Sequence, residues 1–303
     1  MIQNIVETRR RKQEVGGNDE DTTVARTSSS YFASFCTGFA LALVDVIVVF
    51  SAGTICFLML HGALPTTERG FYCNDSSIAA PFYPNSIRAS WLLSVCLGTP
   101  TLAILATEFL LVWKQQRPAR PPSQAIRRYF ARATVLICEY LIGFVLVLSL
   151  VEATKAASGR LRPHFLSVCR PNWTALRPDC AMQPYSFVPY AQCRTTDARA
   201  LRQARHSFPS GHAASAAFSF VYLLLYYRTT ETASFAAASS CNTAMGSALL
   251  VVYALWTAAC CVTRITDAWH HPSDVLVGAA VGLISSYVYF TRRGAKLRVI
   301  QTM

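Results

Sequence analysis

Three short blocks of the sequence carry residue types that suit the binding and transfer of a phosphate group. They read Lys155-x6-Arg162-Pro163, Ser210-Gly211-His212 and Arg264-x5-His270-x3-Asp274. Guanidinium forks and a compact ammonium group can together offset the charge of a phosphomonoester. A helix that opens on Ser-Gly offers free backbone N–H groups to an anion, and an imidazole beside a carboxylate can attack phosphorus or donate a proton.

The third block contains two adjacent histidines, and the spacing does not choose between them. His270 is four residues and His271 three residues before Asp274, so a helical continuation would bring either ring near the carboxylate. Pro272 disfavours helical geometry for His271 and suits the first turn of a following helix. Both histidines therefore stay candidates on spacing alone.

The elements that carry these blocks are predicted to be membrane-spanning helices. Of the 303 residues, 52% are hydrophobic and only 15% are charged, which is too apolar for an ordinary soluble chain. Six apolar runs lie near the length of about 20 residues that a bilayer-spanning helix needs. They are Tyr31–Leu60, Ala89–Trp113, Ala131–Val151, Ala213–Tyr227, Ala244–Val262 and Ser273–Thr291. Buried helices of a soluble protein are disfavoured, because most of these runs lack a polar face.

The sequence therefore predicts an all-α integral membrane protein with six transmembrane helices and a helical bundle as its core. Residues 31–291 form the predicted membrane domain, between a disordered tail at 1–30 and a short tail at 292–303. Basic residues gather before the first span, between the second and third, and after the sixth. Both termini are therefore expected in the cytosol, and all three blocks fall at span ends on the opposite face.

The position of the blocks helps to decide whether their Lys and Arg residues serve the membrane interface or a phosphate site. A single Lys or Arg at a span end commonly extends its charge to the membrane interface, and Ser210 alone could simply cap a helix. Their gathering at one face favours a phosphate site instead. The net charge of +12 is assigned to this cluster and to cytosolic flanks that meet anionic lipids, and no nucleic acid partner is expected.

The predicted outer loops also carry cysteines and glycosylation sequons. Four cysteines lie there, at Cys73, Cys169, Cys180 and Cys193. Their even number permits disulfides, but the connectivity cannot be deduced from spacing, and no paired motif indicates zinc. The sequons at Asn74 and Asn172 are candidate glycosylation sites if these loops leave the cytosol.

In order and spacing, the three blocks resemble the signature blocks of the type 2 phosphatidic acid phosphatase superfamily, and they are most similar to its six-span lipid phosphate phosphatases. The similarity extends through GRLRPHF, SFPSGH, RITDAWHHPSDV and, in the first outer loop, RGFYCNDSSI. It covers roughly residues 31–291. One departure is Thr263, because the third block usually has serine at that position.

The resemblance implies a role for each site residue. His270 would be the nucleophile that forms a phosphohistidine, Asp274 its orienting base, and His212 the acid that protonates the leaving alcohol. The phosphate oxygens would be held by Lys155, Arg162, Ser210, Gly211 and Arg264. No metal and no cofactor are implied. The substrates would be bilayer lipids, namely phosphatidate, lysophosphatidate, ceramide phosphate and sphingosine phosphate, cleaved at the extracellular or lumenal face, with the plasma membrane as the expected location.

Two other functions are compatible with a membrane protein of this kind. A catalytically silent scaffold or adhesion protein is disfavoured because both candidate histidines are present. A transporter is disfavoured because the polar residues gather at one face instead of mid-membrane. Glu152 is expected to pair with Lys155, and His164, His206 and His271 are expected beside the site. The preferred head group and any homo-oligomeric state stay open.

Overall fold

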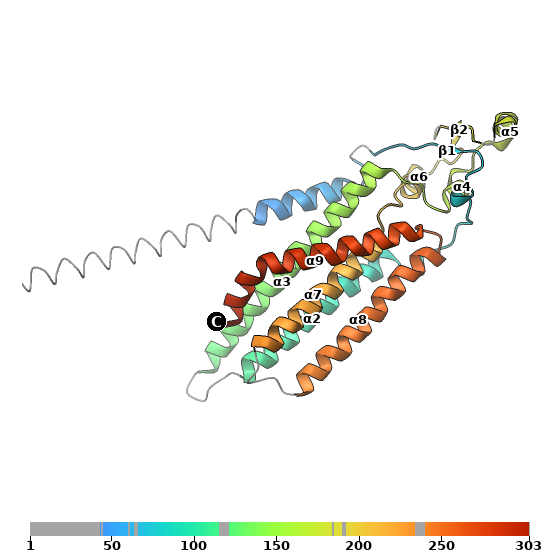
Figure 1. Ribbon diagram of the computed structural model, residues 1–303. Coiled ribbons are helices and arrows are strands. Elements are labelled where there is room, and N and C mark those ends of the chain that lie inside the picture. The colour runs from blue at the N-terminus through green and yellow to red at the C-terminus, as the bar shows by residue number, and fades with distance from the viewer. Residues whose placement is uncertain are drawn as a thin grey trace, which may run out of the picture. The chain divides into compact units, whose positions relative to one another are not determined.

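The computed structural model describes residues 43, 45–59, 61–63, 66–114, 121–183, 185–189, 192–233 and 240–302. Long helices dominate it (Figure 1): α2 (Ala89–Lys114), α3 (Pro122–Ser158), α7 (Gly211–Ala233), α8 (Ser240–Thr266) and α9 (Pro272–Thr302). The two strands of the described part, β1 (Phe71–Tyr72) and β2 (Phe187–Val188), form one short antiparallel pair. The all-α prediction is therefore confirmed. Contacts divide the chain into residues 1–51 and 52–303, and all elements named here lie in the second unit.

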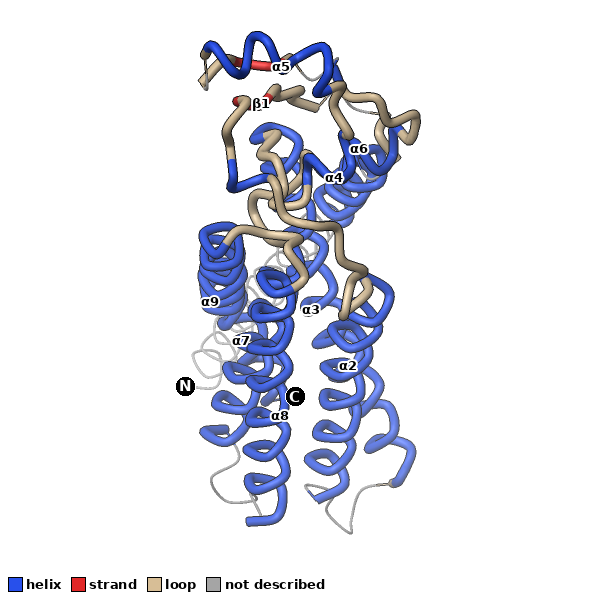
Figure 2. Tube along the Cα trace, turned by 90° about the vertical axis from the view of Figure 1, so that its right-hand side faces the viewer, coloured by secondary structure: helices blue, strands red, loops and turns tan. Residues whose placement is uncertain are grey.

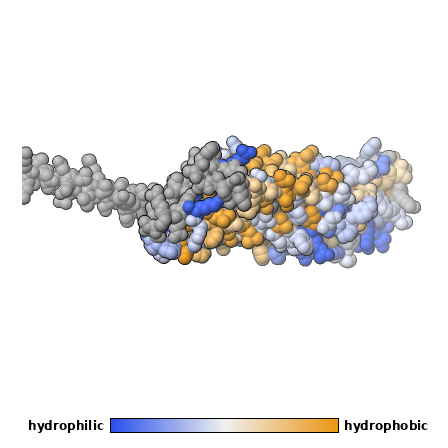
Figure 3. All heavy atoms as spheres, turned by 90° about the horizontal axis from the view of Figure 1, so that it is seen from below, coloured by the Kyte–Doolittle hydropathy of each residue, from blue (hydrophilic) through white to orange (hydrophobic). Residues whose placement is uncertain are grey.

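Four described helices are long and apolar enough to cross a membrane. They are Ala89–Lys114, Pro122–Ser158, Ala244–Thr266 and Pro272–Arg293, and they contain the second, third, fifth and sixth predicted spans. Figure 3 shows hydrophobic residues over the middle of the visible face, with hydrophilic residues more frequent toward one end. Of the first predicted span, Asp45–Met59 forms an apolar helix that is shorter than a full span. The tail 1–30 lies outside the described residues, and a total of six spans stays a prediction.

The fourth predicted span lies within α7, which is surrounded by other helices. α7 packs against α2, α3, α8 and α9, and its Phe218, Tyr222 and Leu223 side chains are fully buried. A helix enclosed in this way can carry tyrosine, serine and histidine, because protein instead of lipid surrounds these side chains. This position explains why α7 is less apolar than its neighbours.

Glycines allow α9 to lie directly against α7. A side chain at Gly282 would come within 2.2 Å of the Ala214 carbonyl oxygen, and one at Gly278 within 2.4 Å of the Ser210 carbonyl oxygen. No larger residue fits such an approach of two backbones. The close contact fixes the first turn of α9, which carries Asp274, beside the first turn of α7.

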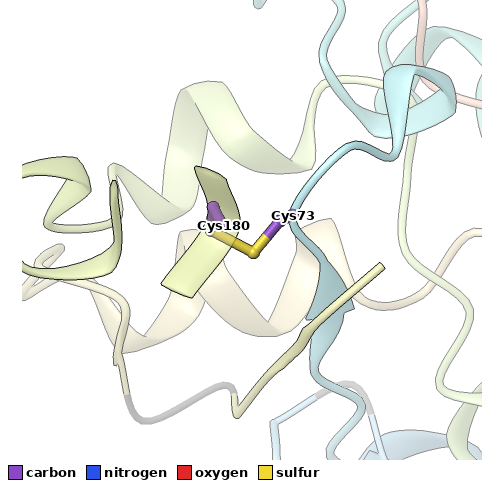
Figure 4. The surroundings of a disulfide bond; sticks show 2 residues. All are labelled: Cys73 and Cys180. Carbon is purple, nitrogen blue, oxygen red and sulfur yellow. A yellow bond between two sulfur atoms is a disulfide. The ribbon is translucent and has the colours of Figure 1, made fainter. Parts of the chain in front are cut away.

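One end of the bundle carries the two longest inter-helix segments, residues 66–88 and 159–210, which we call the cap (Figure 2). Its short helices are η1 (Ser76–Ile78), α4 (Phe165–Cys169), α5 (Trp173–Met182) and α6 (Ala198–Ala204). A small hydrophobic cluster around Phe71, Phe165 and Val188 joins the two segments. The disulfide pairing that spacing left open is Cys73–Cys180 (Figure 4) and Cys169–Cys193, so one bridge links the two segments and the other closes a loop within the second.

A charged cluster lies buried near the opposite end of the bundle. Arg132 of α3 donates from Nε to Glu108 of α2 over 2.7 Å, and the Tyr226 hydroxyl of α7 donates to the same carboxylate over 3.0 Å. Glu108 and Arg132 are 0% and 5% exposed. Neither charge reaches solvent, and the cluster joins three helices.

We predict that Glu108→Ala destabilises the protein by about 3–5 kcal/mol, the cost of removing one partner of a buried ion pair. Tyr226→Phe removes one hydrogen bond from the same carboxylate and should cost only about 1.5–3 kcal/mol. The measurement is the apparent melting temperature of the detergent-solubilised protein, followed by size-exclusion chromatography after heating. Equal shifts for the two variants would contradict the importance of the ion pair.

Candidate active site

The structure brings all three sequence blocks together at the cap end of the bundle. Lys155 lies in the last turn of α3, His212 in the first turn of α7, Arg264 in the last turn of α8 and Asp274 in the first turn of α9. These helix ends meet because α7 packs against α3, α8 and α9. The three blocks therefore lie together in the structure, at one end of the bundle, as the sequence predicts.

A cavity of about 600 Å³ lies between these helix ends and the cap. Five of the predicted site residues line it, namely Lys155, Arg162, His212, Arg264 and His270. Its wall also includes Glu152, His206 and Trp269, together with Arg199 and Arg202 of α6. Cations thus outnumber carboxylates in the wall, which favours an anionic ligand.

His270 is held in one orientation by a backbone carbonyl. Its Nδ1 lies 2.6 Å from the Ser207 carbonyl oxygen, and the side chain is 3% exposed. A carbonyl can only accept, so Nδ1 carries the proton and the lone pair of Nε2 stays available. Burial, followed by the positive charges of Arg162 and Lys155, lowers the pKa of His270 well below 6.5. The ring is therefore neutral at pH 7, as a nucleophile requires.

Asp274 does not contact His270 in the way that the resemblance implies. Its Oδ2 lies 3.9 Å from His270 Nδ1, beyond hydrogen-bonding distance. Instead the fully buried carboxylate accepts from the Ser207 hydroxyl over 2.6 Å, from the His271 backbone N–H over 3.0 Å and from Arg160. Asp274 is therefore linked to the His270 ring through Ser207, whose hydroxyl donates to the carboxylate and whose carbonyl accepts a hydrogen bond from His270 Nδ1.

The other two histidines of these blocks make separate backbone contacts. His271 turns away from the cavity, with its Nε2 at 3.1 Å from the Leu161 carbonyl oxygen. This arrangement favours His270 over its neighbour as the reactive residue. His212 lines the cavity, and its Nε2 lies 3.1 Å from the Ile87 carbonyl oxygen. Only Nδ1 of His212 is then left to face a substrate.

Arg264 and Arg162 each keep a buried donor, Nε, without a partner among the described residues. Arg264 donates to Asn85 Oδ1 over 2.5 Å and to Asp267 over 3.1 Å. Arg162 donates to the His206 carbonyl over 3.1 Å, and its guanidinium carbon lies 4.6 Å from the centre of the Trp269 ring. In both arginines the buried Nε has no hydrogen-bond partner. A buried donor of this kind requires an acceptor, and a phosphate oxygen would supply it.

Burial and the neighbouring Arg264 lower the pKa of Arg162 to about 10, so its guanidinium still carries its charge at pH 7. Lys155 forms the expected pair with Glu152, with Nζ and Oε1 2.6 Å apart. Burial lowers the pKa of His164 and of His206 to about 4, so both are neutral. The His164 ring contacts the Ala268 carbonyl, whereas His206 lines the cavity.

Ser210 and Gly211 lie beside the cavity and serve the packing of α7. The Ser210 backbone N–H donates to the Asp274 carbonyl over 3.0 Å, so this amide is not available to an anion. The Ser210 hydroxyl lies 3.5 Å from the Ala213 amide, where a helix cap would be. A side chain at Gly211 would come within 3.0 Å of Lys155 Nζ, so the glycine leaves room for the ammonium group.

Sequence reasoning did not identify several residues of this site. The segment just before α2 supplies Asn85 to Arg264, and Ser86 donates to Asp267 through both its amide and its hydroxyl over 2.8 Å. Asp267 lies three residues after Arg264, a spacing that could have indicated their ion pair. For Asn85 and Ser86 the sequence carries no signal, because only the fold brings them to α8.

Comparisons with known proteins show the family of the chain. The PAP2 superfamily profile matches residues 136–298, more than half of the chain, from within α3 to within α9, and this range contains all three sequence blocks. The chain belongs to the PAP2 superfamily. Among its relatives, phospholipid phosphatase 2 of Bos taurus is 31% identical over 242 residues, covering 80% of this chain and 78% of the relative. The human phospholipid phosphatase 2 is 31% identical over 243 residues, with the same two shares.

The chain is also similar to proteins with a different name. Phospholipid phosphatase-related protein type 3 of Rattus norvegicus is 27% identical over 257 residues, covering 80% of this chain but only 35% of the relative. No solved structure matches the chain. Membership in the superfamily thus rests on the profile and on the relatives of similar length, and it agrees with the arrangement of the three blocks.

We predict that orthophosphate and orthovanadate raise the melting temperature of the solubilised protein, because the buried Nε donors of Arg162 and Arg264 then gain acceptors. An anion at one hundred times its Kd stabilises the folded state by about 2.7 kcal/mol. Arg264→Ala should remove most of this shift. Arg194→Ala, which changes an exposed arginine of the cap, should leave it unchanged. If neither anion shifts the wild-type melting temperature, the cavity is not a phosphate site.

Proposed function

We propose that this PAP2 superfamily member is a lipid phosphatase that removes phosphate from lipid phosphomonoesters through a phosphohistidine on His270. The observation that carries the proposal is a neutral imidazole, fixed through Nδ1, in a cavity lined by Lys155, Arg162 and Arg264. These are the groups that a phosphoryl transfer needs, namely a nucleophile and cations that stabilise the charge on the equatorial oxygens. The names of the relatives, phospholipid phosphatases, support the same chemistry.

The reaction is a double displacement that needs no metal. Burial, followed by the charges of Arg264 and Lys155, lowers the pKa of His212 to about 3 when the cavity holds no anion, so the proposed acid role requires the bound phosphate dianion to offset these cations so that Nδ1 is protonated. The lone pair of His270 Nε2 attacks phosphorus, the bond from phosphorus to the lipid oxygen breaks, and His212, protonated in this complex, gives its proton to that oxygen. A water molecule then attacks the phosphohistidine while His212 takes a proton from the water, and the bond from nitrogen to phosphorus breaks. The products are the lipid alcohol and inorganic phosphate, and both histidines return to their starting states.

The position of the cavity suits a substrate that stays in the bilayer. Met59, at the end of the apolar helix Asp45–Met59, and Ala89, the first residue of α2, both line the cavity. A lipid beside these helices can place its phosphate among the cations while its chains stay in the hydrocarbon. We propose phosphatidate, lysophosphatidate, ceramide phosphate and sphingosine phosphate as substrates, because each ends in a phosphomonoester.

The proposed face is extracellular or lumenal, with both termini in the cytosol and the plasma membrane as the location. Two observations support it. The cap holds two disulfides, which persist in oxidising compartments. Basic residues gather at the predicted cytosolic ends of the spans. The alternative of a silent scaffold is disfavoured because both His212 and His270 line the cavity.

We predict that the two histidines respond differently to the leaving group. His270→Ala should abolish phosphate release from every phosphomonoester, because no phosphoenzyme can form. His212→Ala should lose about 10²–10⁴-fold with a lipid phosphate, which needs general acid help, and much less with p-nitrophenyl phosphate, whose phenolate departs without a proton. Both variants are assayed in excess chelator with phosphatidate and p-nitrophenyl phosphate.

Three outcomes of this experiment would contradict the assignments. Equal losses for His212→Ala on the two substrates would make His212 a binding residue instead of an acid. Turnover by His270→Ala would move the nucleophile elsewhere, and His271→Ala is the matched variant that tests its neighbour. Wild-type activity that is lost in chelator and restored by magnesium would replace the mechanism with a metal-dependent one.

Sidedness is tested by the two sequons of the cap. Asn74 is exposed and Asn172 is half-buried beside α5. An enzyme that removes asparagine-linked glycans should increase the electrophoretic mobility of the protein, and Asn172→Gln should abolish most of this change because its segment is the longer one. Asn74→Gln tests whether the rest of the mobility change comes from a glycan on Asn74. If an epitope between Arg162 and Arg205 is accessible only from the cytosol, the proposed orientation is wrong.

A further inference from the structure

Arg160 bonds to the groups that orient His270, although it does not line the cavity. Its Nη1 donates to Asp274 Oδ1 over 2.5 Å and to the Ser273 hydroxyl over 2.9 Å. Its backbone carbonyl accepts from the Ser207 N–H over 3.0 Å. One residue thus contacts both Asp274, through its side chain, and Ser207, through its backbone.

These contacts complete a closed set of hydrogen bonds behind the His270 ring. The Ser207 carbonyl accepts from His270 Nδ1, and the Ser207 hydroxyl donates to Asp274 Oδ2. Arg160 then joins Asp274 back to the Ser207 amide. Movement of the Asp274 carboxylate would therefore pull on Ser207 and, through its carbonyl, on the imidazole.

The charge of Arg160 is the second reason for its importance. The Asp274 side chain is 0% exposed, and a buried carboxylate needs a cation or several donors close to it. Arg160 supplies the one full positive charge among the described contacts of Asp274. A surface ion pair contributes little, but here only the arginine, with its side chain 38% exposed, reaches the surface.

We propose that Arg160 is a positioning residue for the phosphoryl transfer: it holds Asp274 and Ser207 so that His270 Nε2 points at phosphorus. The proposal rests on the function proposed above. Because Arg160 acts through other residues and does not touch the substrate, its removal should lower kcat and leave KM unchanged. A misplacement of about 1 Å at a reacting group can cost on the order of 10²-fold in rate, and we expect a loss of that size.

The partial exposure of Arg160 allows a chemical rescue. Arg160→Ala opens a site at the surface that guanidinium or methylguanidinium ions, added below denaturing concentrations, can enter to pair with Asp274. We expect kcat of Arg160→Ala to rise with the concentration of either ion, and Arg160→Lys to keep part of kcat without it. His270→Ala should show no rescue. Arg194→Ala, an exposed arginine elsewhere in the cap, should keep wild-type kcat.

The melting-temperature shift with orthovanadate separates positioning from a general structural role. Arg160→Ala should keep this shift, since the phosphate-binding cations are intact. Four results for Arg160→Ala would each overturn the proposal. They are the loss of both the shift and kcat, a change in KM alone, an unchanged kcat, and a lowered kcat that neither added guanidinium nor the Arg160→Lys substitution restores. A wild-type protein that releases no phosphate would reject the proposed function itself, whereas an active wild type with unaffected Arg160 variants would reject only the role of Arg160.

Discussion

The buried carboxylate of Asp274 is the interaction on which the geometry of the site depends. A charge removed from water must be satisfied by close partners, and those of Asp274 come from three separate parts of the chain: Arg160 after α3, Ser207 before α7, and the His271 amide at the start of α9. Meeting this requirement brings the three segments together. The same contacts fix the carbonyl that selects the tautomer of His270.

The contact of α7 with α9 makes this arrangement possible. At Gly278 and Gly282 the two backbones approach so closely that no side chain would fit, and the amide of Ser210 reaches the Asp274 carbonyl. The first turns of the two helices are therefore fixed relative to each other by the glycine packing and by the hydrogen bond from the Ser210 amide to the Asp274 carbonyl. Small residues in the bundle thus determine how accurately the polar groups are placed at its end.

The cap supplies contacts that the family profile does not cover. Residues 83–87 lie before the matched range of 136–298, yet their side chains or carbonyls meet Arg264, Asp267, Trp269 and His212. The Cys73–Cys180 bridge joins this first segment of the cap to the second. Asn85 of the first segment orients the Arg264 guanidinium, whereas Arg162 is held by the His206 carbonyl and the Trp269 ring. In both arginines the buried Nε lacks a hydrogen-bond partner, so the cavity favours an anion.

Hydrophobic run lengths and block spacing determined the class of the protein, four of its spans, the end of the bundle where the cavity lies and five of the residues that line it. These features follow from local composition and from the alternation of antiparallel helices, so no long-range contact has to be known. Only the tertiary structure decided the disulfide pairing, the use of Ser207 instead of Asp274 as the partner of the His270 ring, and the parts of Asn85 and Arg160. Each depends on a contact between segments far apart in the chain or on a difference of about 1 Å in hydrogen-bond reach, and residue spacing contains neither.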